Sequence, residues 1–367
     1  MDLSTYFYRT GIAVPYYVFP GMGVVINGDC THPKWGLANL RDGVAQLLSA
    51  DLPYGMTGED WDTVLPVLWV KEQFLRVIDA EGVAALTGSD SFIHNLTRVI
   101  STLPNGCNNK GKKERSYEEL QRELLIALRK NVTDPAMLQR IDEGLAYIPT
   151  ENLLKYYLIW NKLSQYGNVM HSKNRPKTAH EYIAVFSRGA IRHLSVDDRQ
   201  ADEGDDSEDD AYRRPRMRYY PYGATHTGTV EHYKKGSSTY LGNTRSGKNP
   251  VETYVNTPLS VISAAKDTDR FVKTNNSTAK PLKLLEMVVG MFTTEGGLVV
   301  DPTAGSGTAA KAAMSLNRKF IVWERDPKQY DGIIEWLGVR SAPLTAPGPS
   351  SLSFGGYPKA VPPNKAA

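Results

Sequence analysis

Apolar residues are spaced as alternating strands and helices over the first hundred residues of the chain. Residues 23–28 (GVVING) and 82–90 (GVAALTGSD) have the length and apolar content of short strands. Residues 44–55 (VAQLLSADLPYG) form a short apolar strand or helix that runs into a Pro turn, and residues 61–78 (WDTVLPVLWVKEQFLRVI) have helical spacing. Strands that alternate with helices predict an α/β fold, in which a parallel sheet is covered on both faces.

The middle of the chain has a different pattern. Within residues 104–150, apolar residues at helical spacing follow a capping box formed by Ser116 and Glu119, so we expect a helical insertion there. Two strand-like stretches come next, YYLIWNK at 156–162 and EYIAVFSRG at 181–189, and they flank a basic loop.

The last third begins irregularly and then becomes regular again. Residues 190–272 are rich in Arg, Lys, Tyr, Gly and Pro and show weak periodicity. Residues 277–292 predict a helix with Thr278 as its cap and Pro281 near its first turn. A buried strand (GLVVDP), a glycine turn, an Ala-rich helix and a second strand (KFIVWE) follow, and the Pro-, Gly-, Ser- and Ala-rich tail from 341 is predicted to be disordered.

Composition sets limits on the class of protein. With 41% hydrophobic and 23% charged residues in 367, the chain suits one large domain with insertions, or two domains. Its only cysteines, Cys30 and Cys107, argue against a disulfide scaffold or a Cys-rich zinc site and favour a reducing cytoplasm. The N-terminus lacks the features of a signal peptide, and no stretch approaches the roughly 20 apolar residues of a membrane helix. We therefore expect a cytoplasmic protein without a membrane segment.

Charge is unevenly distributed. Residues 197–210 (DDRQADEGDDSEDD) contain nine acids and one Arg, a local charge of −8, while the whole chain carries +3. Such a run is typical of a solvated, disordered loop. A metal site there is an alternative, although nothing fixes its geometry, and mimicry of DNA is another. The rest of the chain carries +11 and could face a polyanion.

The glycine turn lies in VVDPTAGSGTAAKAAMSL, residues 299–316. Gly305 and Gly307, between a strand and a helix, would let the backbone approach a ligand closely. No Gly-Lys-Ser/Thr follows, so this is not a phosphate P-loop. Glu324 ends the next strand, where ribose hydroxyls are commonly bound, and Asp301 would repel a pyrophosphate but suits an amino or sulfonium group. The turn thus predicts a nucleotide-type cofactor with a positive group; simple close packing is the alternative.

A second motif, DLPYG, spans residues 51–55. Asp, Pro and Gly favour turns, so one interpretation is only a turn. The other is a pocket for the exocyclic amino group of a base, whose nitrogen lone pair is delocalised into the ring. A carboxylate and a backbone carbonyl that accept both amino hydrogens would localise that lone pair, and an aromatic ring would stack on the base. Asp51, the carbonyl of Leu52 and the ring of Tyr54 supply this set.

Together these stretches resemble a known family. STAKPLKLLE and GLVVDPTAGSGTAAKAAMSLNRKFIVWERDP resemble the cofactor half of S-adenosylmethionine-dependent DNA amino-methyltransferases, and DLPYG with the later GSD resembles their catalytic half. LIWNK and HEYIAVFSRG also resemble family segments, so the likeness covers about 23–103 and 153–340. The order, catalytic motif first, is that of the permuted β group. It implies a Rossmann-like methyltransferase fold with a mostly parallel, doubly wound sheet, and it explains the late glycine turn.

The resemblance implies a division of the chain. The segments are a catalytic half at 1–103, the helical insertion at 104–150, the rest of the catalytic half at 151–190, a target-recognition segment at 191–272 that contains the acidic loop, a cofactor-binding half at 273–340 and a disordered tail at 341–367.

It also implies roles for individual residues. The base pocket would consist of Asp51, Leu52, Pro53 and Tyr54. The methionine end of the cofactor would lie against Asp301, Pro302, Gly305, Ser306, Gly307 and Thr308, with Lys280 and Pro281 nearby chiefly through their backbone, Glu324 on the ribose and Asp29 near the adenine. DNA phosphates or guanines would be contacted by Arg213, Arg214, Arg216, Arg218, Lys234 and Lys235, unless these are simply solvated. No metal is expected.

One position departs from the family pattern. The family usually has Asp-Pro-Pro-Tyr, and here Leu52 replaces the first Pro. We expect this to be tolerated, because the required acceptor is a backbone carbonyl and Pro53 still biases Leu52 toward extended conformations. The cost would be looser preorganisation.

The implied activity is methylation of the amino group of adenine in double-stranded DNA, after the base is flipped into the pocket. Adenine is preferred because the motif begins with Asp, whereas cytosine-modifying relatives more often begin with Ser. Methylation of cytosine, an RNA substrate, a catalytically impaired DNA-binding module and a dinucleotide-dependent oxidoreductase are the alternatives. Such enzymes occur in bacteria and phages. No partner nuclease is indicated, and the oligomeric state, a homodimer included, stays open.

Overall fold

The computed structural model describes residues 2–53, 63–101, 117–147, 153–163, 178–189, 191, 215–232, 249–265 and 279–338. Within them a large sheet has the strand order β1-β2-β11-β10-β3-β4-β6-β5-β9. Its strands are β1 (Tyr16–Phe19), β2 (Gly23–Asn27), β3 (Ala45–Asp51), β4 (Ile78–Gly88), β5 (Leu154–Asn161), β6 (His180–Phe186), β9 (Val261–Ser263), β10 (Leu298–Asp301) and β11 (Lys319–Glu324). Strands β2, β11, β10, β3 and β4 run parallel, which confirms the predicted α/β fold.

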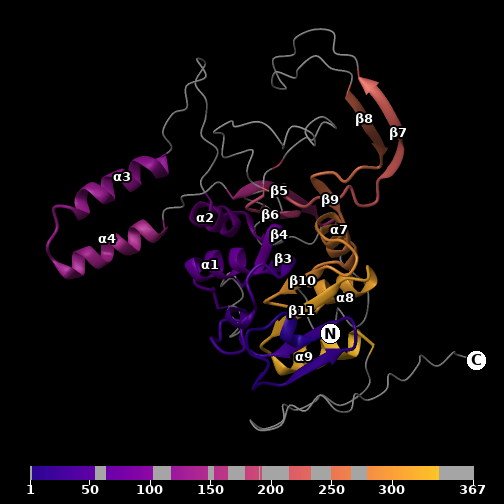
Figure 1. Cartoon of the computed structure of the whole chain (residues 1–367), viewed down its shortest axis with the longest axis horizontal. Helices are drawn as coiled ribbons and strands as arrows, with labels where there is room; N and C mark the ends of the chain where they lie inside the picture. Colours follow the sequence, from indigo (N-terminus) through magenta and orange to yellow (C-terminus); the bar gives the residue numbers. More distant parts are fainter. Residues whose placement is uncertain are drawn as a thin grey trace, which may run out of the picture.

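Helices cover both faces of this sheet (Figure 1). Helices α7 (Leu282–Phe292), α8 (Thr308–Ser315) and α9 (Pro327–Trp336) pack on one face, and α1 (Val67–Val77) and α2 (Asp90–Ile100) pack on the other. Successive strand residues alternate between the two cores: Val299 faces α7 and α8, and Val300 faces the α1 side. Because both faces are covered, the central strands are continuous apolar runs rather than alternating ones.

Strand β10 pairs in parallel with β3, through Val299 opposite Leu47 and Val300 opposite Leu48. From β10 the chain crosses over through α8 to β11, while from β3 it crosses through α1 to β4 on the other face. The two connections diverge here, so a crevice opens beyond the carboxyl ends of β3 and β10. In open α/β sheets such a switch point is where ligands bind.

Several expectations can be compared directly with these elements. The strand at 23–28, the helix within 61–78 and the strands at 156–162 and 181–189 are confirmed, and 44–55 contains a strand rather than a helix. Helix α7 forms as predicted, but Thr278 is not its cap, since the N-cap position is Pro281 and the helix begins at Leu282. Helices α2 and α9 were not identified from the periodicity.

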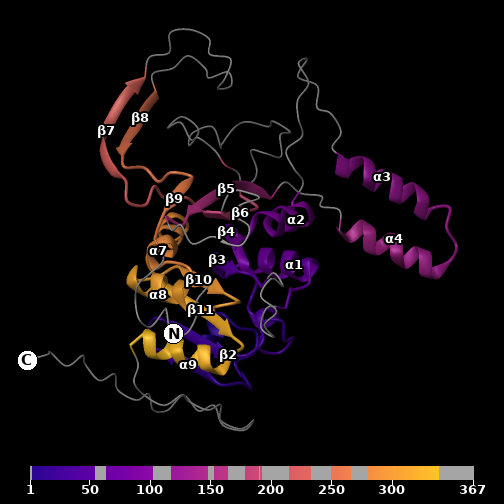
Figure 2. The ribbon, with the colours of Figure 1, turned by 180° about the vertical axis from the view of Figure 1, so that it is seen from behind.

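Two hairpins project from the body in both views (Figures 1 and 2). Helices α3 (Tyr117–Arg129) and α4 (Pro135–Tyr147) confirm helices within the predicted insertion, and an Arg129–Asp142 ion pair of 2.6 Å joins them. Strands β7 (Thr225–His232) and β8 (Asn249–Val255) form an antiparallel ribbon within the segment expected to be irregular. The periodicity did not reveal this ribbon, because the described side chains at 225–227 and 254–255 of its strands are exposed and form no apolar pattern. Ser116, the acidic loop and the tail from 341 lie outside the described residues.

No helix in the described ranges is long and apolar enough to cross a membrane. The same ranges contain no group of three or more His, Cys, Asp or Glu side chains arranged to hold a metal ion.

The segment before the ribbon is anchored on the body. The amide of Tyr220 donates to the carbonyl of Met291 at 2.8 Å, and the ring of Tyr222 packs directly on Gly290 of α7. The Arg218 guanidinium pairs with Asp79 at 3.0 Å and also with Glu81 at the start of β4. These contacts determine where the chain leaves the body toward β7.

A Gly290→Ala substitution tests this anchor, because a Cβ there would overlap the Tyr222 ring. We expect the free energy of unfolding to fall by about 1–3 kcal/mol, as in other overpacked sites. Urea denaturation of the variant provides the measurement. In a Tyr222→Ala background the same substitution should cost much less, and an equal cost in both backgrounds would show that the ring contact is unimportant.

Candidate functional site

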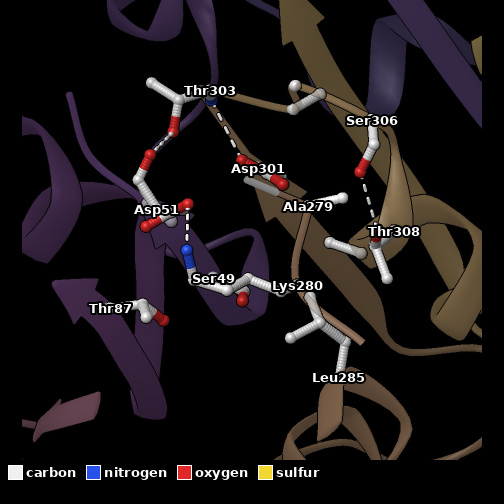
Figure 3. A pocket seen from close by; sticks show the side chains of 14 residues that line it. Ser49, Asp51, Thr87, Ala279, Lys280, Leu285, Asp301, Thr303, Ser306 and Thr308 are labelled. Carbon is white, nitrogen blue, oxygen red and sulfur yellow. Dashed lines mark hydrogen bonds and ion pairs between the residues drawn. The ribbon is translucent and has the colours of Figure 1, made fainter. Parts of the chain in front are cut away.

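The crevice at the carboxyl ends of β3 and β10 holds a pocket (Figure 3). Its walls come from β3, the end of β4, the start of α7 and the turn between β10 and α8. The lining residues are Ser49, Ala50, Asp51, Thr87, Ala279, Lys280, Leu285, Asp301, Thr303, Ala304, Gly305, Ser306, Thr308 and Ala309. Residues from the DLPYG motif and from the glycine turn therefore lie in one site.

Asp51 is the last residue of β3 and joins the two halves of this pocket. Its backbone carbonyl accepts a hydrogen bond of 3.1 Å from the Thr303 hydroxyl, although the two residues are 252 positions apart. Its carboxylate Oδ2 lies 2.5 Å from the Lys280 ammonium (Figure 3). Thus both the main chain and the side chain of Asp51 are positioned by residues of the C-terminal segment, Thr303 and Lys280.

Leu52, the departure from the family pattern, has a structural role. Its side chain is 2% exposed and lies in the apolar core on the α1 side of the sheet. Burial of the side chain restrains the residue that follows Asp51, in addition to the restriction that Pro53 imposes on its backbone. Pro53 is half-buried, and Tyr54 lies outside the described residues.

Lys280 reaches the pocket with its side chain, so the expectation of a chiefly backbone role is incomplete. The side chain is 7% exposed, and its ammonium lies 3.3 Å from Glu181 of β6 as well as against Asp51. Glu181 in turn pairs with Lys162 at 2.6 Å. Although burial opposes ionisation, the Lys280 and Lys162 ammonium groups hold the pKa of Glu181 below its ordinary value.

The glycine turn is shaped by close packing. Gly305 and Gly307 have φ angles of 53° and 77°, the left-handed region that favours glycine. A Cβ on Gly307 would approach the Ile333 side chain of α9 to 2.8 Å. The amide of Gly305 donates to Glu324 Oε2 and the amide of Asp326 to Oε1, each at 2.8 Å. Both oxygens of the Glu324 carboxylate are therefore oriented by the backbone.

Two carboxyl groups in this part of the site are difficult to ionise. Asp301 is 5% exposed, and burial, reinforced by the charges of Asp51 and Glu324, raises its pKa to about 8 even though the Thr303 amide donates to it. Burial likewise raises the pKa of Glu324 to about 7. Such a pair favours a ligand that brings positive charge or hydrogen-bond donors.

The remaining predicted residues are less closely associated with the pocket. Ser306 and Thr308 line it and share a hydrogen bond of 2.8 Å, whereas Pro281 caps α7 beside it. Asp29 lies outside the lining residues, in the loop after β2, where its carboxylate accepts from the amide and hydroxyl of Thr31. Pro302 is buried directly after Asp301.

The residues predicted to contact DNA differ in where the structure places them. Arg216 is exposed. Arg218 is 10% exposed and pairs with Asp79 and Glu81, so the structure gives it the role of an anchor rather than a DNA contact. Arg213, Arg214, Lys234 and Lys235 lie outside the described residues.

Four functional candidates were not identified individually from the sequence: Thr303, Trp160, Lys162 and Glu181. Thr303 sits inside the glycine-turn motif. Trp160, Lys162 and Glu181 lie in LIWNK and HEYIAVFSRG, which were noted as family-like without roles. Their contribution depends on the pairing of β5 with β6, which brings Trp160 opposite Glu181.

Comparisons with known proteins bear on this geometry. The model of one protein family, the N6/N4 methyltransferases described as DNA methylase, matches residues 51–335. The type II methyltransferase M.HindIII of Haemophilus influenzae is 42% identical over 60 residues, which are 16% of this chain and 19% of that relative.

Among solved structures, the M1.HpyAVI–SAM complex matches with 14% identity and a TM-score of 0.42, over 87% of this chain and all of the other. The cytosine-N4-specific PvuII DNA methyltransferase matches with 13% identity and a TM-score of 0.43, over 85% of each chain. TTHA0409 of Thermus thermophilus matches with 16% identity and a TM-score of 0.38, over 88% of this chain and 95% of the other. Since the family match covers well over half of the sequence and begins at Asp51 itself, this chain belongs to the N6/N4 family of DNA methylases.

Proposed function

We propose that this protein transfers a methyl group from S-adenosylmethionine to the exocyclic amino nitrogen of adenine in double-stranded DNA. The observation that supports it most directly is the convergence of Asp51 and the Asp301–Thr308 turn in one pocket at the switch point of the sheet. Family membership supports the reaction class, and the pocket suggests a role for each group.

The donor set suits S-adenosylmethionine. That cofactor carries a positive amino group and a positive sulfonium, which would relieve the electrostatic cost of ionising the buried Asp301. Its ribose hydroxyls would donate to Glu324, whose oriented oxygens each retain capacity for a second hydrogen bond. When bound, the cofactor supplies an electrophilic methyl group on sulfur, so the protein's contribution is mainly positioning and electrostatics.

Asp51 would act on the base. Its carboxylate would accept one amino hydrogen and the carbonyl of Leu52 the other, which localises the nitrogen lone pair for attack on the methyl carbon. The Thr303 hydroxyl holds the main chain at Asp51 and thereby fixes the direction of both acceptors. Geometry of this kind is sensitive to shifts of about an ångström.

The target must leave the helix to reach this pocket, because a duplex hides the amino nitrogen. Flipping a base costs a few kcal/mol. Stacking on Tyr54 would offset part of that cost, at about 1–3 kcal/mol per base. Adenine is preferred over cytosine because the motif begins with Asp; the amino group of cytosine is the second candidate, since it would present the same two hydrogens to Asp51 and Leu52.

The β7–β8 ribbon is our candidate for contact with DNA outside the pocket. It projects from the body in both views, and two-stranded ribbons fit the major groove (Figures 1 and 2). Arg216 lies exposed on the segment that leads to it. Arg213, Arg214, Lys234 and Lys235 remain predicted contacts.

An Asp51→Asn variant tests the reaction. The amide cannot accept hydrogen bonds as strongly as the carboxylate and also presents donors, so we expect methylation to fall by at least about 100-fold. Mass spectrometry of nucleosides from unmethylated DNA, incubated with enzyme and S-adenosylmethionine, measures the product.

Retained cofactor binding is the control for that variant. Asp51-dependent methyladenosine would support the proposal, methylcytidine would change the base and keep the mechanism, and full activity of Asp51→Asn would contradict the role of Asp51.

An Asp301→Asn variant tests the cofactor site through stability. A carboxyl whose pKa rises from 3.8 to about 8 on folding makes the folded state bind more protons, so it lowers stability progressively as pH rises between these values. The variant lacks this penalty. Without cofactor it should therefore melt at nearly the wild-type temperature near pH 4 and several degrees higher near pH 8.

Thermal melts with and without S-adenosylmethionine complete that test. The wild type should be stabilised by the cofactor, and the variant should lose most of this stabilisation. A variant that melts lower than the wild type at pH 8, or that keeps the full cofactor shift, would contradict the assigned role of Asp301.

A further inference from the structure

Behind Asp51 lies a line of alternating charges. The Asp51 carboxylate, the Lys280 ammonium, the Glu181 carboxylate and the Lys162 ammonium are linked by distances of 2.5, 3.3 and 2.6 Å in that order. The line crosses three separate parts of the fold: the end of β3, the residue before Pro281, and the pair formed by β6 and the residue that follows β5. Lys280 is its most buried member, with 7% of its side chain exposed.

Lys280 is confined by its surroundings. Its ammonium lies 6.0 Å from the centre of the Trp160 ring, and the Lys162 ammonium lies 5.4 Å from the same ring. Trp160 is 1% exposed, and its indole N–H donates to the carbonyl of Ala264 at 2.9 Å. A fixed aromatic wall and two carboxylates thus hold the ammonium where it meets Asp51.

Asp51 lies in a site that contains several acids. Asp301 of β10 is close enough to Asp51 for the two charges to interact, and Glu324 of β11 acts on Asp301 in turn. Glu181 of β6 contacts the Lys280 ammonium. Among the described residues that line the pocket, Lys280 is the only cation. Lys162 does not line the pocket and contacts Glu181 instead. Close carboxylates favour protonation of one another, and a neighbouring cation opposes it.

The protonation state of Asp51 matters for its proposed role. An ionised carboxylate is acceptor-only and has about four lone-pair sites, so it can accept from Lys280 and from a base amino group together. A protonated carboxyl becomes a donor and loses acceptor capacity. The reaction would then lose one of the two acceptors that localise the nitrogen lone pair.

We propose that Lys280 is a positioning residue for methyl transfer: its ammonium keeps Asp51 ionised and oriented, while Glu181, tied to Lys162, fixes the ammonium. This inference rests on the proposed amino-methylation. It assigns Lys280 to the acceptor of the base rather than to the cofactor, and it gives Glu181 and Lys162 a supporting role in the same reaction.

The test is the pH dependence of methylation in a single turnover, with saturating S-adenosylmethionine and unmethylated duplex DNA. For Lys280→Met we expect the acidic limb of the pH–rate profile to move to higher pH by at least about one pH unit. At a fixed pH below both limbs, the rate divided by each enzyme's own plateau is then at least tenfold lower in the variant than in the wild type. Lys280→Arg retains the charge and should restore a limb close to that of the wild type.

Two further variants serve as matched controls for the position of the acidic limb. One should not raise its pH, and the other should raise it less than Lys280→Met does. Glu181→Gln removes an anion and leaves Lys280 to Asp51 alone, so its limb should stay at or below that of the wild type. Lys162→Met removes a cation from the far side of Glu181 and should move the limb less than Lys280→Met does. A purely structural lesion would lower the plateau in each variant without moving the limb.

Cofactor affinity, measured by calorimetry, separates this role from a direct one. We expect Lys280→Met to bind S-adenosylmethionine within about threefold of the wild type. An acidic limb that does not move in Lys280→Met would overturn the inference. If S-adenosylmethionine also binds at least tenfold more weakly, Lys280 belongs to the cofactor site instead. If Lys280→Met is inactive at every pH, the Glu181→Gln variant decides the question. An acidic limb at higher pH than that of the wild type overturns the inference, and a limb at the same or lower pH supports it. A wild type that produces no methylated base would instead refute the proposed function, and it is measured first.

Discussion

The parallel pairing of β10 with β3 is the constraint on which the site depends. It joins strands from opposite ends of the chain through Val299 opposite Leu47 and Val300 opposite Leu48. Because the carboxyl ends of parallel strands meet at one edge, Asp301 and Asp51 come to the same crevice. The hydrogen bond from Thr303 to the carbonyl of Asp51 closes the junction. A shift in this pairing would separate the glycine turn from the DLPYG motif.

The buried acids of the site lower the stability of the free protein. Asp301 and Glu324 are buried where ionisation is unfavourable, and the free protein would be more stable with neutral side chains. In the proposed function a positive cofactor would offset the charges of Asp301 and Glu324, while Lys280 pairs with Asp51 and Glu181. This division accounts for the acids at the carboxyl ends of β10 and β11, and for a lysine buried beside a tryptophan only a few ångströms from Asp51.

Local patterns predicted much of the fold. Apolar runs identified β2, β4, β10 and β11 because strands covered on both faces have a distinctive composition. They misplaced the cap of α7, since Thr278 is a good capping residue but Pro281 holds the N-cap position. They missed the β7–β8 ribbon, and they offered Arg218 as a DNA contact. A basic residue in a polar segment looks the same in sequence whether it faces a phosphate or pairs with Asp79.

By itself the sequence determined the alternation of strands and helices, the two motifs, their order and the residue types that suit an amino group and a positive cofactor. Only the tertiary structure decided that Lys280 reaches Asp51, that Glu181 and Lys162 stand behind it, that Leu52 packs in the core, and that Arg218 is an anchor. The physical reason is the range of the interactions. Periodicity and turn chemistry act over a few residues, whereas these contacts depend on strand order and register, which bring Arg218 to Asp79 across 139 positions and Lys280 to Asp51 across 229.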